Sequence, residues 1–196
     1  MSQIKLKHSG GNGVIIAAPS SNPASDRTLL LPSDGDSTID TLGRAGNFLQ
    51  VVQESTTTQV TNTTTTYSDT NLSATITPTS SSNKILICIS QQMLFQISSS
   101  GGGAGINILR GSTEIHSAPQ NSIGAYSHFV SGGGITSLNL HFTYNLHYLD
   151  SPNTTSATTY KTQAKLYEAA SSAHIISQFN STVDGTSYMT LMEVAA

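Results

Sequence analysis

Charge and cysteine are both scarce in this sequence. Lys, Arg, Asp and Glu make up 10% of its 196 residues, whereas they make up roughly 25% of an average soluble protein. The eight Lys and Arg residues are scattered and the net charge is -3, which disfavours nucleic-acid binding because no basic patch meets the phosphates. The single cysteine, Cys88, cannot form an internal disulfide, so stability must come from packing or association.

Long apolar runs are also missing. None approaches the roughly 20 residues that a membrane-spanning helix needs, and the N-terminal MSQIKLKHSG has no apolar signal-peptide core. We therefore expect no membrane insertion and synthesis in a cytoplasm. Serine, threonine and asparagine cover the surface instead, in runs such as 55–71 and 151–160. Such a neutral polar coat suits extracellular or virion surfaces.

The apolar segments are typical of β-strands. Almost all alternate with period two or are short β-branched runs bounded by Gly, Pro, Ser or Asn. The best helical window, residues 38–52, is interrupted by Gly43 and Gly46, and each glycine costs about 1 kcal/mol in a helix. We therefore predict an all-β fold, an antiparallel β-sandwich or jelly roll. Its expected strands are Phe48–Gln53, Leu72–Thr77, Lys84–Phe95, Ile106–Arg110, Ala125–Ser131, Thr136–Leu149, Thr159–Tyr167, His174–Asn180 and Tyr188–Val194.

The clearest strand is SLNLHFTYNLHYLD, residues 137–150. Apolar residues occupy its even positions from Leu138 to Tyr148, and its odd positions include His141, Thr143 and His147, so one face of this strand belongs to a core. The segment ATTYKTQAKLYEA, residues 157–169, shows the same alternation of apolar and polar residues with more exceptions. In that segment we expect Tyr160, Gln163 and Lys165 to face water at least in part.

The first 45 residues have shorter apolar segments than the rest of the chain. Three short apolar pieces, IKL, VIIAA and TLLLP, are separated by turn residues that include Pro19, Pro23 and Pro32. Three such pieces cannot bury a sheet face by themselves. We therefore divide the chain into an N-terminal arm, residues 1–45, and a sandwich domain, residues 46–196.

The glycine cluster at residues 10–13 invites comparison with nucleotide-binding loops. Such loops need a strand before the glycines and a helix after them, or a Gly-Lys-Ser/Thr sequence, and neither context is present. Asn12–Gly13 is instead a favoured hairpin turn. A calcium loop starting at Asp34 fails as well, because its sixth and twelfth positions are Ile39 and Ala45.

Catalytic and metal-binding motifs are equally sparse. The sequence has no nucleophile elbow, no His-Glu-x-x-His and no informative carboxylate pair, so we predict no enzyme activity and no cofactor. Cys88 is expected to be a buried, inert strand residue. His141 and His147 lie about 20 Å apart along one strand, too far for one metal within a chain. A ring of three copies of either histidine around a threefold axis is left open as a metal site, as is a weak cation site at the turn that starts at Asp34.

The segment IKLKHSGGNGVIIAAPSSNPASDRTLLLPSDG resembles the amino-terminal module of many bacteriophage tail-fibre and virion proteins, especially of marine phages. That module has a strand of pattern GV-I-AP, a strand of pattern RTLTLP-DG and a segment of pattern GN-LQVVQ. In this sequence they correspond to Gly13–Pro19, to Arg27–Pro32 with Asp34–Gly35, and to Gly46–Gln53. Residues 67–90 and 187–196 look like the C-terminal domain that often accompanies this module. Its strand pattern is similar to that of trimeric C1q- and tumour-necrosis-factor-like jelly rolls.

The resemblance implies a homotrimeric virion structural protein, a short tail fibre or receptor-binding tip made in the host cytoplasm. The arm would dock on other virion proteins, and loops around 98–105, 117–124 and 151–156 would face outward toward a host surface glycan. Tyr126 and Tyr160 are the candidate receptor contacts. The candidate docking residues are Ile4, Leu6, Val14, Ile15, Ile16, Leu29, Leu30 and Leu31.

Two other functions remain open at this point. The arm joins the sandwich almost immediately, without the long shaft of a tail fibre, which favours a capsid decoration protein of the same fold. The strand pattern also fits a C1q-like soluble carbohydrate-binding module. Location on the particle separates the first from a tail fibre, and sugar binding without particle docking separates the second.

Overall fold

A computed structural model of the chain describes residues 3–7, 10–11, 13–17, 45–97, 102–117, 126–127, 138–167, 173–179 and 185–196. The chain divides into two compact units, Met1–Ile39 and Asp40–Ala196. Strands form the regular structure of both units. Within the described residues there is no helix that is long and apolar enough to cross a membrane.

The described part of the first unit is a β-hairpin. Strands β1 (Gln3–Lys7) and β2 (Gly13–Ala17) pair antiparallel, with Ile4 opposite Ile16. The predicted hairpin is therefore confirmed. Its connection is longer than expected, because Lys7 pairs with Gly13 and residues 8–12 lie between them, so Asn12–Gly13 is not a two-residue turn.

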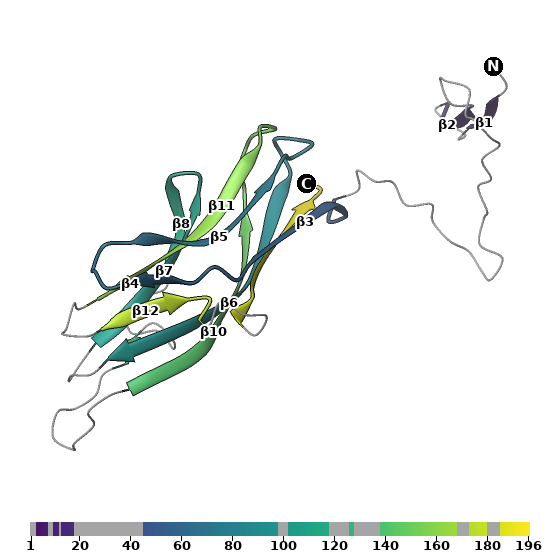
Figure 1. The fold of residues 1–196 in the computed structure, drawn as a ribbon. Helices are drawn as coiled ribbons and strands as arrows, with labels where there is room; N and C mark the ends of the chain where they lie inside the picture. The colour runs from purple at the N-terminus through teal and green to yellow at the C-terminus, as the bar shows by residue number, and fades with distance from the viewer. Residues whose placement is uncertain are drawn as a thin grey trace. The chain divides into compact units, whose positions relative to one another are not determined.

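The second unit is a sandwich of two antiparallel sheets, which Figure 1 shows as two facing layers. The first sheet contains β3 (Phe48–Thr56), β4 (Val60–Asn62), β6 (Lys84–Ile97), β10 (Leu138–Asp150), β12 (His174–Ser177) and β13 (Ser187–Val194). The second sheet contains β5 (Ser68–Ile76), β7 (Gly102–Arg110), β8 (Thr113–Ser117), β9 (Tyr126–Ser127) and β11 (Thr158–Leu166).

The strand order is that of a jelly roll. Strands β3 and β4 share one lane of the first sheet, and β13 and β12 share the next, since both of these pair with β6. The first sheet therefore has the order β3/β4, β12/β13, β6, β10, and the second has the order β5, β11, β7, β8. If each of these eight positions is numbered in chain order, the sheets read 1-8-3-6 and 2-7-4-5. This arrangement confirms the predicted all-β sandwich.

Each predicted strand window overlaps an observed strand, although only Tyr126–Ser127 is described within Ala125–Ser131. Two strands were missed, β4 and β8. Both are short, and VTN and TEIHS carry too few apolar residues to stand out from the polar runs around them.

The core between the sheets is divided by a polar layer. One apolar cluster contains Leu72, Ile87 and Leu191, and the other contains Phe95 and Leu166. Gln91, Gln178, Ser187, Thr70 and Thr162 are all buried. The Gln178 amide donates to the carbonyls of Thr70 and Thr58 at 2.8 and 3.1 Å and accepts from Gln91 Nε2 at 3.0 Å. Buried polar groups are tolerated when they are hydrogen-bonded in this way.

Candidate functional site

The two ends of the sandwich can be identified from the strand ends that lie there. The Gly46 N–H donates to the carbonyl of Ala195 at 2.9 Å, and the Ala195 N–H donates to the carbonyl of Asn47 at 2.9 Å. The start of β3 and the end of β13 therefore lie together, at an end that we call the base. Because residues 46–48 directly follow the arm in the chain, the arm joins the sandwich at the base. We call the opposite end the distal end.

Strand directions assign the connections to these ends. Lys84 at the start of β6 pairs with Val194, so β6 runs from the base to the distal end. The strand ends next to residues 98–101 and 168–172 are therefore distal. In contrast, Asp150 at the end of β10 pairs with Ile85, which puts residues 151–157 at the base. This loop therefore lies at the opposite end of the sandwich from residues 98–101, which the sequence could not show because it does not give the direction of each strand. Its role as a receptor contact stays a prediction.

Tyr160 lies in the core and not on the surface. Its side chain is fully buried, and its hydroxyl donates to Asp150 Oδ2 at 2.7 Å. Arg110 Nη1 donates to both oxygens of the same carboxylate at 2.9 Å. Burial, and then the hydrogen bond and charge of Asp150, raise the pKa of the Tyr160 hydroxyl. The proposal that Tyr160 contacts a receptor is therefore wrong; the residue ties the two sheets together.

The other candidate contacts are described only in part. Tyr126 belongs to β9 and pairs with Gly103 at the distal end of β7. Its side chain lies outside the described residues. In the arm, Ile4, Leu6, Val14, Ile15 and Ile16 belong to the hairpin strands. Leu29, Leu30 and Leu31 lie outside the described residues, so the docking role of all eight stays a prediction.

Both histidines of the clearest strand are exposed. His141 and His147 lie on the outer face of the first sheet, the face turned away from the core. The His141 ring packs against Phe179 with 5.0 Å between ring centroids. His147 lies opposite Cys88, with 3.2 Å between its Nδ1 and the Cys88 Sγ. Within the described part of one chain, no three potential metal ligands come together.

Cys88 is not the buried core residue that was expected. It is half-buried on the outer face, because in β6 the residues Ile87 and Ile89 take the core-facing positions. Burial raises the pKa of the thiol, so the neutral thiol is favoured beside His147. The segment KILICIS is apolar on both faces, and for that reason its alternation could not identify the face that carries Cys88.

A shallow hollow of about 320 Å³ surrounds this pair. Cross-strand register places Gln53, Thr190, Cys88 and His147 in one row across β3, β13, β6 and β10. The hollow is lined by Gln53, Cys88, Ile89, Ser90, Asn145, His147, Tyr188 and Thr190. The lining contains no Lys, Arg, Asp or Glu, so the hollow provides hydrogen bonds and soft ligands in place of fixed charge.

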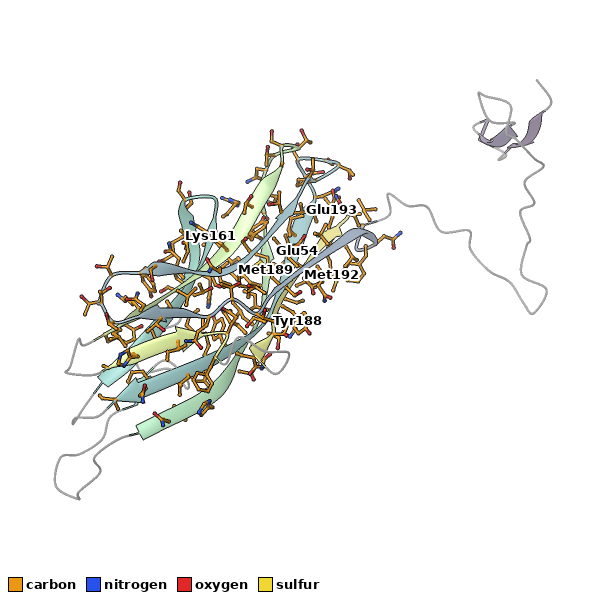
Figure 2. All side chains as sticks on the ribbon, viewed as in Figure 1. Glu54, Lys161, Tyr188, Met189, Met192 and Glu193 are labelled. Carbon is orange, nitrogen blue, oxygen red and sulfur yellow. The ribbon has the colours of Figure 1, made fainter. Side chains whose placement is uncertain are left out.

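The neighbouring row on the outer face is apolar. Val51, Met192, Leu86 and Leu149 lie side by side across the same four strands. Val51 is 59% exposed and Leu149 is 49% exposed. Figure 2 labels Met192 and Tyr188, which mark this face along β13. Exposed apolar rows of this kind are typical of surfaces that bind another protein.

An aromatic cluster that the sequence did not reveal lies near the distal end of the second sheet. The Lys165 ammonium lies 4.6 Å from the ring centre of Tyr67 and 5.2 Å from that of Tyr167. The Tyr67 hydroxyl is 3.2 Å from Ser117 Oγ. Gly105 lies beneath the rings, and a Cβ at this position would come within 2.9 Å of the Tyr67 hydroxyl. Half-buried tyrosines paired with a cation provide a stacking surface.

Comparison with known proteins adds little to this picture. No protein-family model matches the chain, and no curated protein matches it. The resemblance to phage tail-fibre modules therefore rests on the sequence motifs alone.

Among solved structures, the chain is similar to the infectious bursal disease virus Gx strain structure, with 14% identity, a TM-score of 0.37 and coverage of 94% of this chain and 47% of that one. The VP2 subviral particle of the same virus gives 13% identity, a TM-score of 0.36 and coverage of 87% and 42%. Dimeric latent PorU from Porphyromonas gingivalis gives 10%, 0.34 and coverage of 80% and 14%. The chain thus spans less than half the length of these proteins, and likenesses this distant carry no argument about its function.

Proposed function

We propose that the chain is a non-enzymatic structural protein of a phage particle, either a short tail fibre or a receptor-binding tip. Its arm docks on other virion proteins, and its jelly roll projects from the docking point. The observation that best supports this proposal is the separation of the two ends of the sandwich. The chain enters from the arm at the base, and the strand ends next to residues 98–101 and 168–172 are at the distal end.

The composition of the surface supports the same function. The described turns between strands, such as 63–66, 79–83 and 151–156, carry mainly serine, threonine and asparagine, which form adaptable hydrogen bonds with a glycan. The cluster of Tyr67, Lys165 and Tyr167 replaces Tyr160 as the candidate stacking surface for a sugar ring. A host surface glycan is therefore the proposed receptor class.

Self-association is part of this proposal. The apolar row of Val51, Met192, Leu86 and Leu149 favours contact with another protein surface over contact with water. A homotrimer built around this face would cover the row in all three copies. The mass of the purified full-length protein in solution tests it, and a species with the mass of one chain contradicts it.

The first experiment is localisation on the particle. A gold-labelled antibody against the sandwich is imaged on intact virions by electron microscopy, with virions that lack the protein as the control. Label at the tail supports the fibre or tip. Label spread over the head contradicts that form and identifies a capsid decoration protein, whereas labelling equal to the control contradicts a virion role altogether.

A second experiment separates the proposal from the remaining classes. The full-length protein is incubated with surface polysaccharide of the host, and both binding and polymer viscosity are followed. Binding without loss of viscosity supports a non-enzymatic receptor-binding protein. Loss of viscosity contradicts the non-enzymatic assignment. Sugar binding together with an absence from virions supports a soluble lectin.

A further inference from the structure

Strand β10 is the longest edge of the described sandwich. Its thirteen residues pair with β6 in one unbroken register, and among the described strands it pairs with no other. Figure 1 shows it as the outermost strand of its sheet. About half of the backbone donors and acceptors of an edge strand point away from its single partner. Over 13 residues this makes an edge of roughly 43 Å that no other described strand covers.

This edge lacks the features that usually protect an edge strand from pairing. Lysine, proline and β-bulges are the common protection, and β10 contains none of them between Leu138 and Asp150. The other long edge strands differ, because the pairings of β3, β5 and β8 each include a register shift. A straight, neutral edge is a template for another strand.

A second copy of β10 fits this template. Antiparallel pairing of the strand with itself over its whole length places Tyr144, the central residue, opposite the same residue of the second copy. In this register Phe142 lies opposite Leu146, and Leu140 lies opposite Tyr148. The half-buried apolar residues of both copies therefore share one face of the joined sheet, as strand pairing requires.

The same register brings the two histidines together. His141 and His147 are equally distant from Tyr144, one on each side, so His147 of one copy lies directly opposite His141 of the second. Residues directly opposite in an antiparallel pair have Cβ atoms about 5 Å apart. Cys88 already lies opposite His147 within the chain. One row across three adjacent strands thus contains Cys88, His147 and the second copy's His141.

This row has the composition of a zinc site. Thiolate sulfur and imidazole nitrogen are the preferred zinc ligands, and tetrahedral bond lengths place such a sulfur and nitrogen about 3.5 Å apart. The Cys88 Sγ and His147 Nδ1 are 3.2 Å apart, so two ligands are almost in place before any metal binds. A single chain has no third ligand beside them in its described residues, and the second copy supplies it.

We propose that two copies of the chain pair through β10 around Tyr144 and bind a zinc-class divalent cation at Cys88, His147 and the second copy's His141. The twofold axis generates two such sites in each dimer. On coordination the Cys88 thiol loses its proton to solvent, and the resulting thiolate and two neutral imidazoles bind the metal. The fourth tetrahedral position is left for water.

This inference is independent of the proposed virion function. It uses the edge of β10, whereas the proposed homotrimer uses the apolar row on the sheet face. A protein found nowhere on a virion can still form the metal-linked dimer, and a tail protein can still lack it.

The test is metal complementation between two variants of the full-length protein. The variant H141N keeps Cys88 and His147, and the double variant C88S/H147N keeps His141. Neither variant alone has a complete site, but a mixed dimer has one. Cobalt(II) is the probe, since a thiolate-to-cobalt absorption band with tetrahedral visible bands identifies the ligand set.

We expect wild-type protein to bind one cobalt ion per chain with a thiolate band, and each variant alone to lose at least tenfold in cobalt affinity. The mixture should regain the band, with at most one ion per two chains, the value reached when every dimer is mixed. Recovery in the mixture also shows that both variants are folded. Wild-type affinity in H141N, or no recovery in the mixture, overturns the shared site. The control H116N, on β8, should bind cobalt like the wild type.

A charge pair on the edge tests the pairing register itself. Thr143 and Asn145 are exposed, and the register places each opposite the other in the second copy. T143K/N145K puts lysine opposite lysine twice and should raise the dimer dissociation constant roughly tenfold. The matched variant T143E/N145K puts glutamate opposite lysine and should leave the constant near the wild-type value. Equal effects of the two variants, measured by sedimentation with zinc present, overturn the register.

Discussion

Glu193 is a buried carboxylate that accepts hydrogen bonds from neutral groups. Its oxygens accept from Gln50 Nε2 at 2.6 Å, from Asn83 Nδ2 at 2.6 Å, and from the Thr79 amide and hydroxyl at 2.6 and 2.8 Å. These donors come from β3 and from the turn between β5 and β6. A buried charge is costly unless hydrogen-bonded in this way, so Glu193 fixes three segments at the base.

The titration of Glu193 follows from this environment. Burial by itself raises its pKa, but the hydrogen bonds from Asn83, Gln50 and Thr79 outweigh burial and lower the pKa from 4.5 to about 2. A carboxyl whose folded pKa lies below its unfolded value stabilises the fold above the unfolded value. This stabilisation is lost as the pH falls from about 4.5 through about 2.

We predict that E193Q lowers the free energy of unfolding by roughly 2–3 kcal/mol at pH 7, because the new amide group faces donors and leaves one of them unpaired. Urea unfolding at pH 7 and at pH 3 measures the effect, and the difference from wild type should shrink at the lower pH. The matched control is E54Q, a change of an exposed glutamate on β3; both residues are labelled in Figure 2. A loss in E54Q as large as that in E193Q would contradict this account.

At the scale of strands, β12 and β13 lie end to end along one side of β6, and the sheet is interrupted between them. Strands β12 and β13 both pair with β6, but Gln178 between them has a positive φ of 52°. Gly185 lies in the same interruption, and a Cβ added there would overlap the carbonyl oxygen of Phe179. Backbone contacts of this kind cannot move aside as the end of a side chain can. Glycine at position 185 therefore allows the chain to return to the sheet.

We predict that G185A destabilises the fold by about 2–3 kcal/mol, since it overpacks a backbone contact. The control is G111A in the tight turn between β7 and β8. Gly111 has a positive φ of 59° but open space around its Cα, so alanine there should cost only about 1–2 kcal/mol of backbone strain. Thermal unfolding of both variants ranks the two effects. The reverse order would mean that the interruption is more pliable than its contacts indicate.

The strands themselves could be predicted from the sequence, because alternation and turn residues are local signals. The face that each strand buries could not. The alternation in β11 separates Tyr160 and Thr162 from Lys161 and Gln163, but only the opposing sheet determines which set is the core. The expectation that Tyr160 faces water at least in part is wrong for this reason. The Asp150 carboxylate that accepts its hydroxyl comes from the preceding strand of the other sheet, and no local pattern reports that contact.

The candidate site was predictable to a similar extent. The polar face of β10 and its two histidines could be found from the sequence, because that strand alternates regularly from Leu138 to Tyr148. The position of Cys88 opposite His147 depends on cross-strand register. The contact of Lys165 with Tyr67 and Tyr167 likewise depends on which strands pair in the folded chain. These are long-range properties, which a single sequence does not report.

At the scale of the whole molecule, the arm and the sandwich form separate compact units, Met1–Ile39 and Asp40–Ala196. The sandwich has its own two apolar clusters, and the hydrogen bonds between residues 46–47 and Ala195 close its base without any residue from the first unit. A fold with a closed core of this kind does not require the arm for its stability.

We therefore predict that removal of residues 1–39 shifts the melting temperature of the sandwich by less than about 2 °C, which corresponds to less than about 1 kcal/mol for a domain of this size. Association with the virion should be lost at the same time, because the apolar strands proposed to dock are removed. Calorimetry of the full-length and shortened proteins measures the first effect, and co-sedimentation with particles lacking the protein measures the second. A shortened protein that still co-sediments would move the docking surface to the sandwich, where the apolar row across Val51, Met192, Leu86 and Leu149 is the first region to substitute.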